Sequence, residues 1–200
     1  MARAADPAKR EHLLRQVRAY VISNGLADLS LRPLAKALGT SDRMLLYYFG
    51  SKEQLLAQAL EQDEERPLLV LRRALDIAGT PRDPAGMRNL LEEIWRQFTM
   101  TPGRRDILPV TFEVMTASLL NPDRYGPVMR SLLTEWRRLL ASAFTGLGMP
   151  DHTAEAEATL LVDTLLGLLH APLADGDWGR ATAAFQTLLD RLEPAWHTTQ

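Results

Sequence analysis

Apolar residues along this chain recur at spacings of three and four positions, which is the period of an α-helix. Alternating apolar and polar residues, the pattern of a half-buried strand, never last more than a few positions. Proline, glycine and short polar residues separate the apolar stretches. The pattern predicts an all-α fold of roughly nine helices, with an N-terminal three-helix domain and a larger helical domain.

The first part of the chain predicts three short helices. One runs through residues 13–21 and ends near Gly25. Ser30 is placed to cap the second, which ends at Gly39, and Ser41 is placed to cap the third. A second and third helix joined by a tight turn of this kind form a helix-turn-helix.

A longer helix is expected over residues 52–78, but Pro67 interrupts it. A proline inside a helix removes a backbone hydrogen bond and clashes with the preceding turn. The sequence therefore predicts a kink or break at residues 65–67.

The remainder of the chain predicts longer amphipathic helices. Asp83 followed by Pro84 is a strong start signal, since it combines a cap with a proline in the first turn. Residues 101–103 should break that helix. Four more helices are expected at about 107–120, 128–144, 152–171 and 178–193.

Composition narrows the class of protein. The chain has 200 residues, 46% of them hydrophobic and 24% charged, an ordinary globular composition. It has 0 Cys, which excludes disulfides, thiol nucleophiles and cysteine zinc sites. With no N-terminal apolar signal and no uninterrupted apolar run of about 18 residues, we expect a cytoplasmic protein without a membrane span.

Charge is distributed unevenly. Residues 1–60 hold nine Lys/Arg and five Asp/Glu, a net charge of +4, and the rest of the chain carries −6. A basic head on an acidic body suggests a polyanionic partner for the head, although chance alone can produce such an imbalance.

The sequence DRMLLYYF, residues 42–49, forms the third helix. At about 100° per residue, Leu45 and Phe49 share one face, directed into the core. Tyr47 lies nearly opposite them with Arg43 one turn earlier, while Tyr48 falls on the flank of the core face. Exposed tyrosine and arginine side chains can donate hydrogen bonds to DNA phosphates, and arginine can also bind guanine.

Lys52, in the first turn of the next helix, can add a phosphate contact. The alternatives stay open: Tyr47 can be an idle surface aromatic and Lys52 a solvated surface charge.

Residues 29–56, LSLRPLAKALGTSDRMLLYYFGSKEQLL, resemble the tetracycline-repressor (TetR) family of bacterial transcription regulators. The resemblance lies in the Leu-Ala and Gly of the turn, the aromatic end of the third helix and the following Ser-Lys-Glu. It covers about a quarter of the chain, and the rest matches in helix number and length alone.

The resemblance implies a DNA-binding site on double-stranded operator DNA. Arg32 matches a position that contacts phosphates or base edges. Thr40 and Ser41 match the turn that caps the recognition helix. The full set implied is Arg32, Thr40, Ser41, Asp42, Arg43, Met44, Tyr47, Tyr48 and Lys52.

Two residues depart from the family pattern. Leu46 stands where the family usually has tyrosine, so a common phosphate-contacting hydroxyl is absent and Tyr47 is expected to replace it. Arg43 stands where many members have glycine, which places a longer, charged side chain toward the major groove.

The resemblance also implies two domains: residues 1–51 for DNA binding, linked by helix 52–78, and residues 52–200 for ligand binding and dimerisation. The predicted helix around 159–171 is apolar on nearly every side, so it needs burial on more than one face. Pairing the two C-terminal helices with those of a second copy would form a homodimer, which would read a palindromic operator. The same helices can instead be intramolecular core.

A pocket for an unknown small-molecule effector is expected among the helices from 83 to 144. Its candidate lining is also compatible with ordinary core packing, and comprises Trp95, Phe98, Phe112, Glu113, Met115, Thr116, Trp136 and His170. The resemblance implies that binding there would change the separation of the two DNA-binding domains of the dimer through helix 52–78.

No enzyme chemistry is evident. The four histidines lack metal-binding spacing, and no phosphate loop or nucleophile elbow occurs, so no catalytic residue, metal or cofactor is predicted. We therefore expect a ligand-responsive transcriptional repressor and not an enzyme. An interaction adaptor that reuses a helix-turn-helix, or a small all-α enzyme, remains the alternative.

Overall fold

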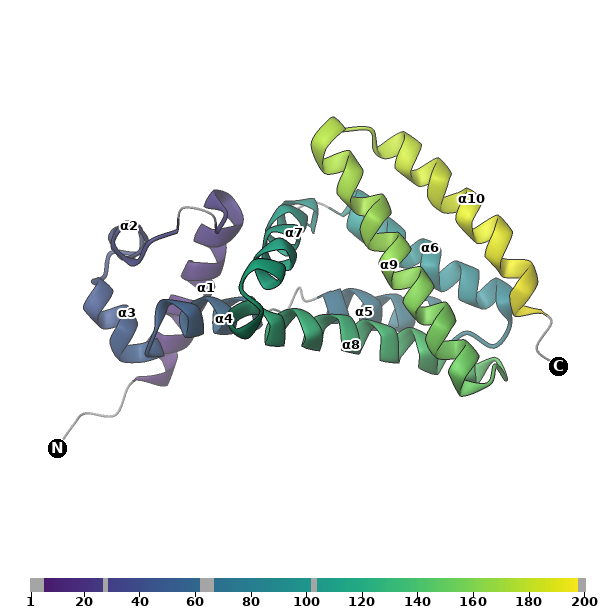
Figure 1. Cartoon of the computed structure of the whole chain (residues 1–200), viewed down its shortest axis with the longest axis horizontal. Coiled ribbons are helices and arrows are strands. Elements are labelled where there is room, and N and C mark those ends of the chain that lie inside the picture. The colour runs from purple at the N-terminus through teal and green to yellow at the C-terminus, as the bar shows by residue number, and fades with distance from the viewer. Residues whose placement is uncertain (1–5, 27–28, 62–66, 102–103, 198–200) are drawn as a thin grey trace. The chain divides into compact units, whose positions relative to one another are not determined.

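The computed structural model describes residues 6–26, 29–61, 67–101 and 104–197, and every regular element in those ranges is an α-helix (Figure 1). This confirms the all-α prediction. The helices are α1 (Pro7–Asn24), α2 (Leu31–Ala37), α3 (Asp42–Phe49), α4 (Lys52–Glu61), α5 (Pro67–Ala78), α6 (Pro84–Met100), α7 (Arg104–Leu120), α8 (Pro122–Gly146), α9 (Asp151–Asp175) and α10 (Trp178–Trp196).

Most of the predicted caps are present. The side chain of Ser41 accepts a hydrogen bond from the amide of Met44, and that of Asp83 accepts one from Gly86. Ser30 precedes α2 as expected, but its side chain makes no capping hydrogen bond. The serine therefore marks the start of α2 without satisfying any of its free first-turn amides.

Several helices are longer than the sequence predicted. α7 and α8 begin at Arg104 and Pro122, and each carries a proline at its sixth residue. α9 and α10 likewise continue through Pro172 and Pro194. The expected helix 107–120 already included Pro109, whereas the other three expected helices began after Pro127 or stopped before Pro172 and Pro194. A proline removes one helical hydrogen bond, but the backbone stays helical through all four positions.

The predicted break at 65–67 falls largely on residues 62–66, which lie outside the described part of the chain. On either side, α4 ends at Glu61 and α5 begins at Pro67. A proline at the first position of a helix costs no hydrogen bond, since that amide has no partner within the helix.

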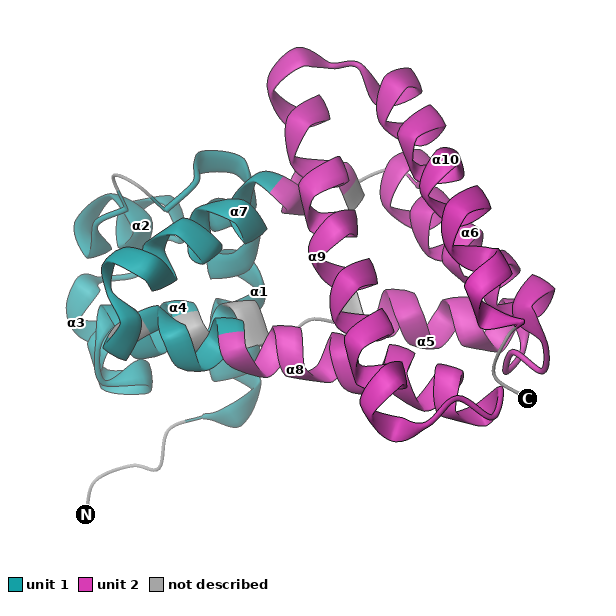
Figure 2. Ribbon diagram, turned by 45° about the vertical axis from the view of Figure 1, so that its right-hand side comes forward, with its two compact units in different colours: residues 1–66, 109–129 teal, residues 67–108, 130–200 magenta. Residues whose placement is uncertain are grey.

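The chain forms two compact units, shown separately in colour in Figure 2. Unit 1 comprises residues 1–66 and 109–129, and unit 2 comprises residues 67–108 and 130–200. Segment 109–129 thus belongs with the N-terminal helices, whereas the sequence placed it in the second domain. The expected functional division at residue 51 stays a prediction.

Unit 1 has a core of aliphatic side chains from its short helices. α4 packs against both α1 and α3, and α2 packs against α3. Val17 and Leu34 are fully buried in it. Burying such a side chain contributes about 1.5–3 kcal/mol, enough to hold helices too short to be stable alone.

Unit 2 is built around α6 and the pair α9–α10. α6 packs against α5 and α10, and α10 lies along α9. Trp95 of α6 stacks on Phe185 of α10 with ring centroids 4.6 Å apart and planes 10° apart. The indole Nε1 donates to Thr182 Oγ1 at 3.1 Å, so this buried aromatic pair leaves no unsatisfied N–H.

Arg88 joins α6 to α10 through polar groups. Its guanidinium donates to Asp190 at 2.9 Å, Glu193 at 3.0 Å and Gln186 at 2.9 Å, and to Glu92 of its own helix at 3.0 Å. The hydrogen bond to Glu193, followed by that to Asp190, raises the pKa of Arg88 above its usual value. The side chain is 23% exposed, so solvent screens these contacts only in part.

Replacing Arg88 by methionine should therefore lower the free energy of unfolding by about 2 kcal/mol, because it leaves three carboxylates without their shared cation. Urea unfolding monitored by circular dichroism measures this. Arg96→Met is the control, since Arg96 is exposed and pairs with Glu93 of its own helix. Equal losses for the two variants would show that Arg88 does not join the helices energetically.

Candidate nucleic-acid interface

The turn between α2 and α3 has the geometry of a helix-turn-helix. Gly39 has φ +64°, a left-handed conformation that glycine adopts without steric cost. The amide of Thr40 then donates back to the carbonyl of Ala35 at 2.9 Å. Ser41 begins α3 directly afterwards, so three consecutive residues reverse the chain and start the next helix.

α3 has one buried and one exposed face, as its sequence predicted. Leu45 is 0% and Phe49 3% exposed. Tyr47 is 56% exposed and Leu46 41%, and Arg43 is exposed beside them. The exposed face of α3 therefore carries a phenol and a guanidinium one helical turn apart.

The adjacent tyrosines have separate environments. The rings of Tyr47 and Tyr48 meet edge to face, with centroids 5.3 Å apart and planes at 82°. Tyr48 also lies 6.1 Å from the ring of buried Phe49. Half-buried Tyr48 thus supports the exposed ring of Tyr47 from the core side, which restricts the orientations of that ring.

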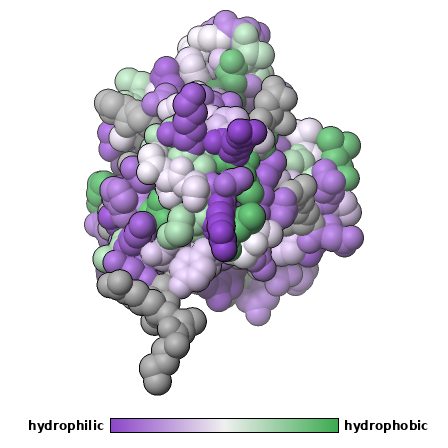
Figure 3. Space-filling view, turned by 90° about the vertical axis from the view of Figure 1, so that its left-hand side faces the viewer, coloured by the Kyte–Doolittle hydropathy of each residue, from purple (hydrophilic) through white to green (hydrophobic). Residues whose placement is uncertain are grey.

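The predicted DNA-binding residues of α2 and the turn lie together. Arg32, Thr40, Ser41 and Asp42 line a shallow hollow, together with Lys36. Two cations and two hydroxyls, which suit a phosphate group, thus share this patch with the carboxylate of Asp42. Figure 3 views the side of the molecule that carries α2 and α3, where hydrophilic side chains cover much of the surface.

The carboxylate of Asp42 has a local partner, because it accepts a hydrogen bond from the backbone amide of Arg43 at 2.9 Å.

Lys52 has an internal partner in this structure. Its Nζ donates to the carbonyl oxygen of Leu29, which connects the start of α4 to the segment preceding α2. Its phosphate contact stays a prediction. Met44, the remaining member of the predicted set, is half-buried on α3.

Sequence reasoning missed Arg10. Its guanidinium lies 5.4 Å from the ring centroid of Phe49 and donates to Gln58 Oε1 on α4. Arg10 therefore connects α1 to α3 and α4 on the side where Phe49 is buried. Partners 39 and 48 positions away leave no local pattern in the sequence that could reveal them.

The candidate effector residues fall into both units. Trp95, Phe98, Trp136 and His170 belong to unit 2, and Phe112, Glu113, Met115 and Thr116 to unit 1. Trp95 stacks on Phe185 as described, and Phe98 lies 5.9 Å from Trp136. Thr116 and His170 are exposed, while Phe112 and Met115 are half-buried. Glu113 hydrogen-bonds the amide of Leu26.

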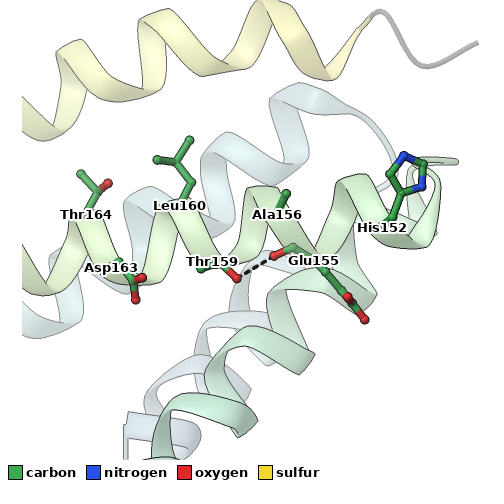
Figure 4. A pocket seen from close by; sticks show the side chains of 7 residues that line it. All are labelled: His152, Glu155, Ala156, Thr159, Leu160, Asp163 and Thr164. Carbon is green, nitrogen blue, oxygen red and sulfur yellow. Dashed lines mark hydrogen bonds between the residues drawn. The ribbon is translucent and has the colours of Figure 1, made fainter.

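A hollow in unit 2 lies on one face of α9, outside the predicted residues. It is open and shallow, and is lined by His152, Glu155, Ala156, Thr159, Leu160, Asp163 and Thr164 (Figure 4). Leu160, one of these lining residues, is 46% exposed. Asp163 pairs with Arg137 at 2.9 Å. A single exposed leucine among polar neighbours is ordinary for a protein surface, so this hollow does not by itself indicate a binding site.

These features define a helix-turn-helix protein with a helical body. Residues 14–59 match the model of the bacterial regulatory proteins of the tetR family. The HTH-type transcriptional regulator BetI of Stenotrophomonas maltophilia is 33% identical over 82 residues, which span 40% of this chain and 42% of that relative, less than half its length. Residues 14–59 therefore match the DNA-binding segment of the tetR family, as the sequence of residues 29–56 indicated.

Solved structures share the whole fold. A protein of Saccharomonospora viridis, described as a transcriptional regulator in complex with choline, has TM-score 0.71 and 23% identity, covering 94% of this chain and 96% of that one. The multidrug-binding protein EbrR, complexed with proflavin, has TM-score 0.63 and 24% identity, covering 92% and 99%. At this identity the likeness establishes the fold and leaves the ligand open.

Leu45 and Leu46 provide a matched test of the orientation of α3. Leu45→Ala should lower the free energy of unfolding by about 2–5 kcal/mol, because it leaves a cavity in the core. Leu46→Ala should cost well under about 1 kcal/mol, because the side chain is largely in solvent. Urea unfolding of both variants measures the difference, and similar costs would contradict the orientation of α3.

Proposed function

We propose that this protein is a ligand-responsive transcriptional repressor that binds a palindromic operator in double-stranded DNA as a homodimer. The observation that carries the proposal is the exposed face of α3, with Arg43 and Tyr47 opposite the buried Leu45 and Phe49. In a helix-turn-helix, the exposed face of the second helix enters the major groove. The match of residues 14–59 to the tetR-family model supports the same function.

Each residue of this interface has a proposed role. Arg43 reads base edges, since its guanidinium can bind guanine O6 and N7 together. Tyr47 donates a hydrogen bond from its hydroxyl to a phosphate. It thereby replaces the tyrosine that the family usually has at the position of Leu46. Arg32, Ser41 and Thr40 bind phosphate at the hollow, and Lys52 adds a further cation. Asp42, Met44 and Tyr48 complete the surface.

The net charge of residues 1–60 supports a nucleic-acid partner for the N-terminal helices. Residues 1–60 carry a net +4, although the whole chain is at −2. Neutralising DNA phosphates with Lys and Arg releases counterions, so binding of the head should weaken steeply as salt rises.

Dimerisation through α9 and α10 is supported by the composition and burial of α9. An 18-residue window of α9 has mean hydropathy 1.3, but only 33% of it is buried within the protomer. By length and composition such a helix could cross a membrane, yet helices from the cores of soluble proteins meet the same criterion. A second copy of α9 and α10 would cover the exposed face of α9 that carries Leu160. We propose that α9 and α10 of two copies pair in this way to form the homodimer. We also propose that the protein is cytoplasmic.

The effector is proposed to bind among the helices of residues 83–144 and to release DNA. Structural neighbours hold choline and proflavin, so a screen should begin with these two compounds. Aromatic rings can bind an organic cation through their faces, although Trp95, Phe98 and Trp136 are buried in this structure. The screen measures the loss of operator binding as each compound is added. Repression itself is proposed to come from occlusion of a promoter by the bound dimer.

Arg43→Ala should relax base preference at the positions read by α3, because a bidentate arginine contributes about 1–3 kcal/mol of discrimination. Lys52→Ala should weaken binding to every sequence evenly and reduce the salt slope by about one. Selection from a random DNA pool, followed by binding at several salt concentrations, measures both effects.

Loss of the Lys52–Leu29 hydrogen bond could lower stability, but it would not change the salt slope. The slope therefore separates a phosphate contact from a structural role. Unchanged base preference and affinity in both variants would contradict the proposed interface.

Leu160→Arg should convert the dimer to a monomer, since it buries a charge in the proposed α9 interface without a partner. Leu119→Arg is the matched control, because Leu119 is 78% exposed and lies on α7, outside α9 and α10. Size-exclusion chromatography with light scattering at micromolar concentration measures the mass. A monomeric wild-type protein would contradict the proposal.

A further inference from the structure

A carboxylate from α7 contacts the N-terminal helices of unit 1. Glu113 Oε2 accepts a hydrogen bond from the amide of Leu26 at 2.7 Å, across 87 positions of sequence. The preceding amide, Gly25, donates to the carbonyl of Val21 at 2.8 Å and closes α1. The amide of Leu26 is thus the first one beyond the end of α1, and a side chain from α7 satisfies it.

Gly25 makes room for this contact. It has φ +74°, and a Cβ added there would lie 3.1 Å from Glu113 Oε2. That distance is shorter than an ordinary van der Waals contact, so a side chain at position 25 would push the carboxylate away. Two independent features of the α1 terminus, the free amide and the missing Cβ, accommodate the same carboxylate.

α7 takes part in both units. Its residues up to Leu108 belong to unit 2, and from Pro109 onward it belongs to unit 1, with Glu113 one turn further. Within unit 2, the guanidinium of Arg105 lies 4.3 Å from the ring centroid of Trp178, at the first residue of α10. α7 therefore carries one charged side chain with a partner in unit 1, Glu113, and another with a partner in unit 2, Arg105.

The electrostatics of the Glu113 contact make it sensitive to position. The C-terminal end of a helix carries partial negative charge, which repels a carboxylate. The hydrogen bond from Leu26 N–H offsets this repulsion, but only while the two atoms stay within hydrogen-bond distance. A small shift of α7 would remove the attraction and leave the repulsion.

We propose that Glu113 is a positioning residue for the DNA-reading helices. It fixes the end of α1, from which the chain leads to α2 and α3, and makes their placement depend on α7. The inference rests on the proposed function and deepens it, because it names the contact through which a displacement of α7 would reach the recognition helix.

The first experiment uses hydrogen exchange on the free, full-length protein. In Glu113→Ala the amide of Leu26 should exchange about tenfold faster or more, as expected from loss of a hydrogen bond to a charged group. Glu113→Gln keeps a carbonyl acceptor and should restore much of the protection. Asp123→Asn, which neutralises an exposed carboxylate in the first turn of α8, is the control and should leave the amide unchanged.

The second experiment measures operator binding as the spacing between half-sites is varied. Glu113→Ala should bind its best spacing about fivefold more weakly and tolerate neighbouring spacings better, with base preference unchanged. A merely structural loss would lower the active fraction at every spacing by the same factor. Glu113→Gln should return the profile toward wild type.

The outcomes separate the inference from the function. Unchanged Leu26 exchange in Glu113→Ala, or a spacing profile of wild-type shape, would overturn the positioning role even if the protein binds DNA. Failure of the wild-type protein to bind any selected sequence would overturn the proposed function, while Leu26 exchange would still report whether Glu113 holds the end of α1.

Discussion

The burial of Leu45 and Phe49 is the constraint on which the DNA-reading surface depends. They lie four residues apart on a helix of eight residues, and both are almost fully buried. Two anchors on one face leave a short helix no freedom to rotate about its axis. Their burial therefore determines that Arg43, Leu46 and Tyr47 face outward, whatever DNA they meet.

Other contacts support this anchoring from outside α3. Arg10 covers the ring of Phe49 and reaches α4, and Tyr48 packs between that ring and Tyr47. The exposed phenol of Tyr47 is thus supported edge to face by Tyr48, which in turn lies beside the buried Phe49 ring. A rigid aromatic side chain loses little conformational entropy on binding, which favours a specific interface.

Prolines coincide with the places where the chain passes from one compact unit to the other. Pro67 and Pro109 are the first residues after two of these passages, and Pro127 comes two residues before the third. Each proline lacks a backbone N–H, so helical hydrogen bonding cannot be complete around Pro109 and Pro127. The sequence predicted a kink or break at Pro67 and kept Pro109 inside an expected helix, but it did not connect these prolines with the passages between the units.

The sequence by itself determined the helical class, the caps at Ser41 and Asp83, the two faces of α3 and the resemblance of the helix-turn-helix segment to the tetR family. These follow from local periodicity and short-range hydrogen bonds, which neighbouring residues specify. Only the tertiary structure decided that Glu113 binds the end of α1, that Lys52 binds the Leu29 carbonyl and that Arg88 joins α6 to α10. Such partners lie 23 to 105 positions apart, and a carboxylate or cation carries no mark in sequence of the distant group that will meet it.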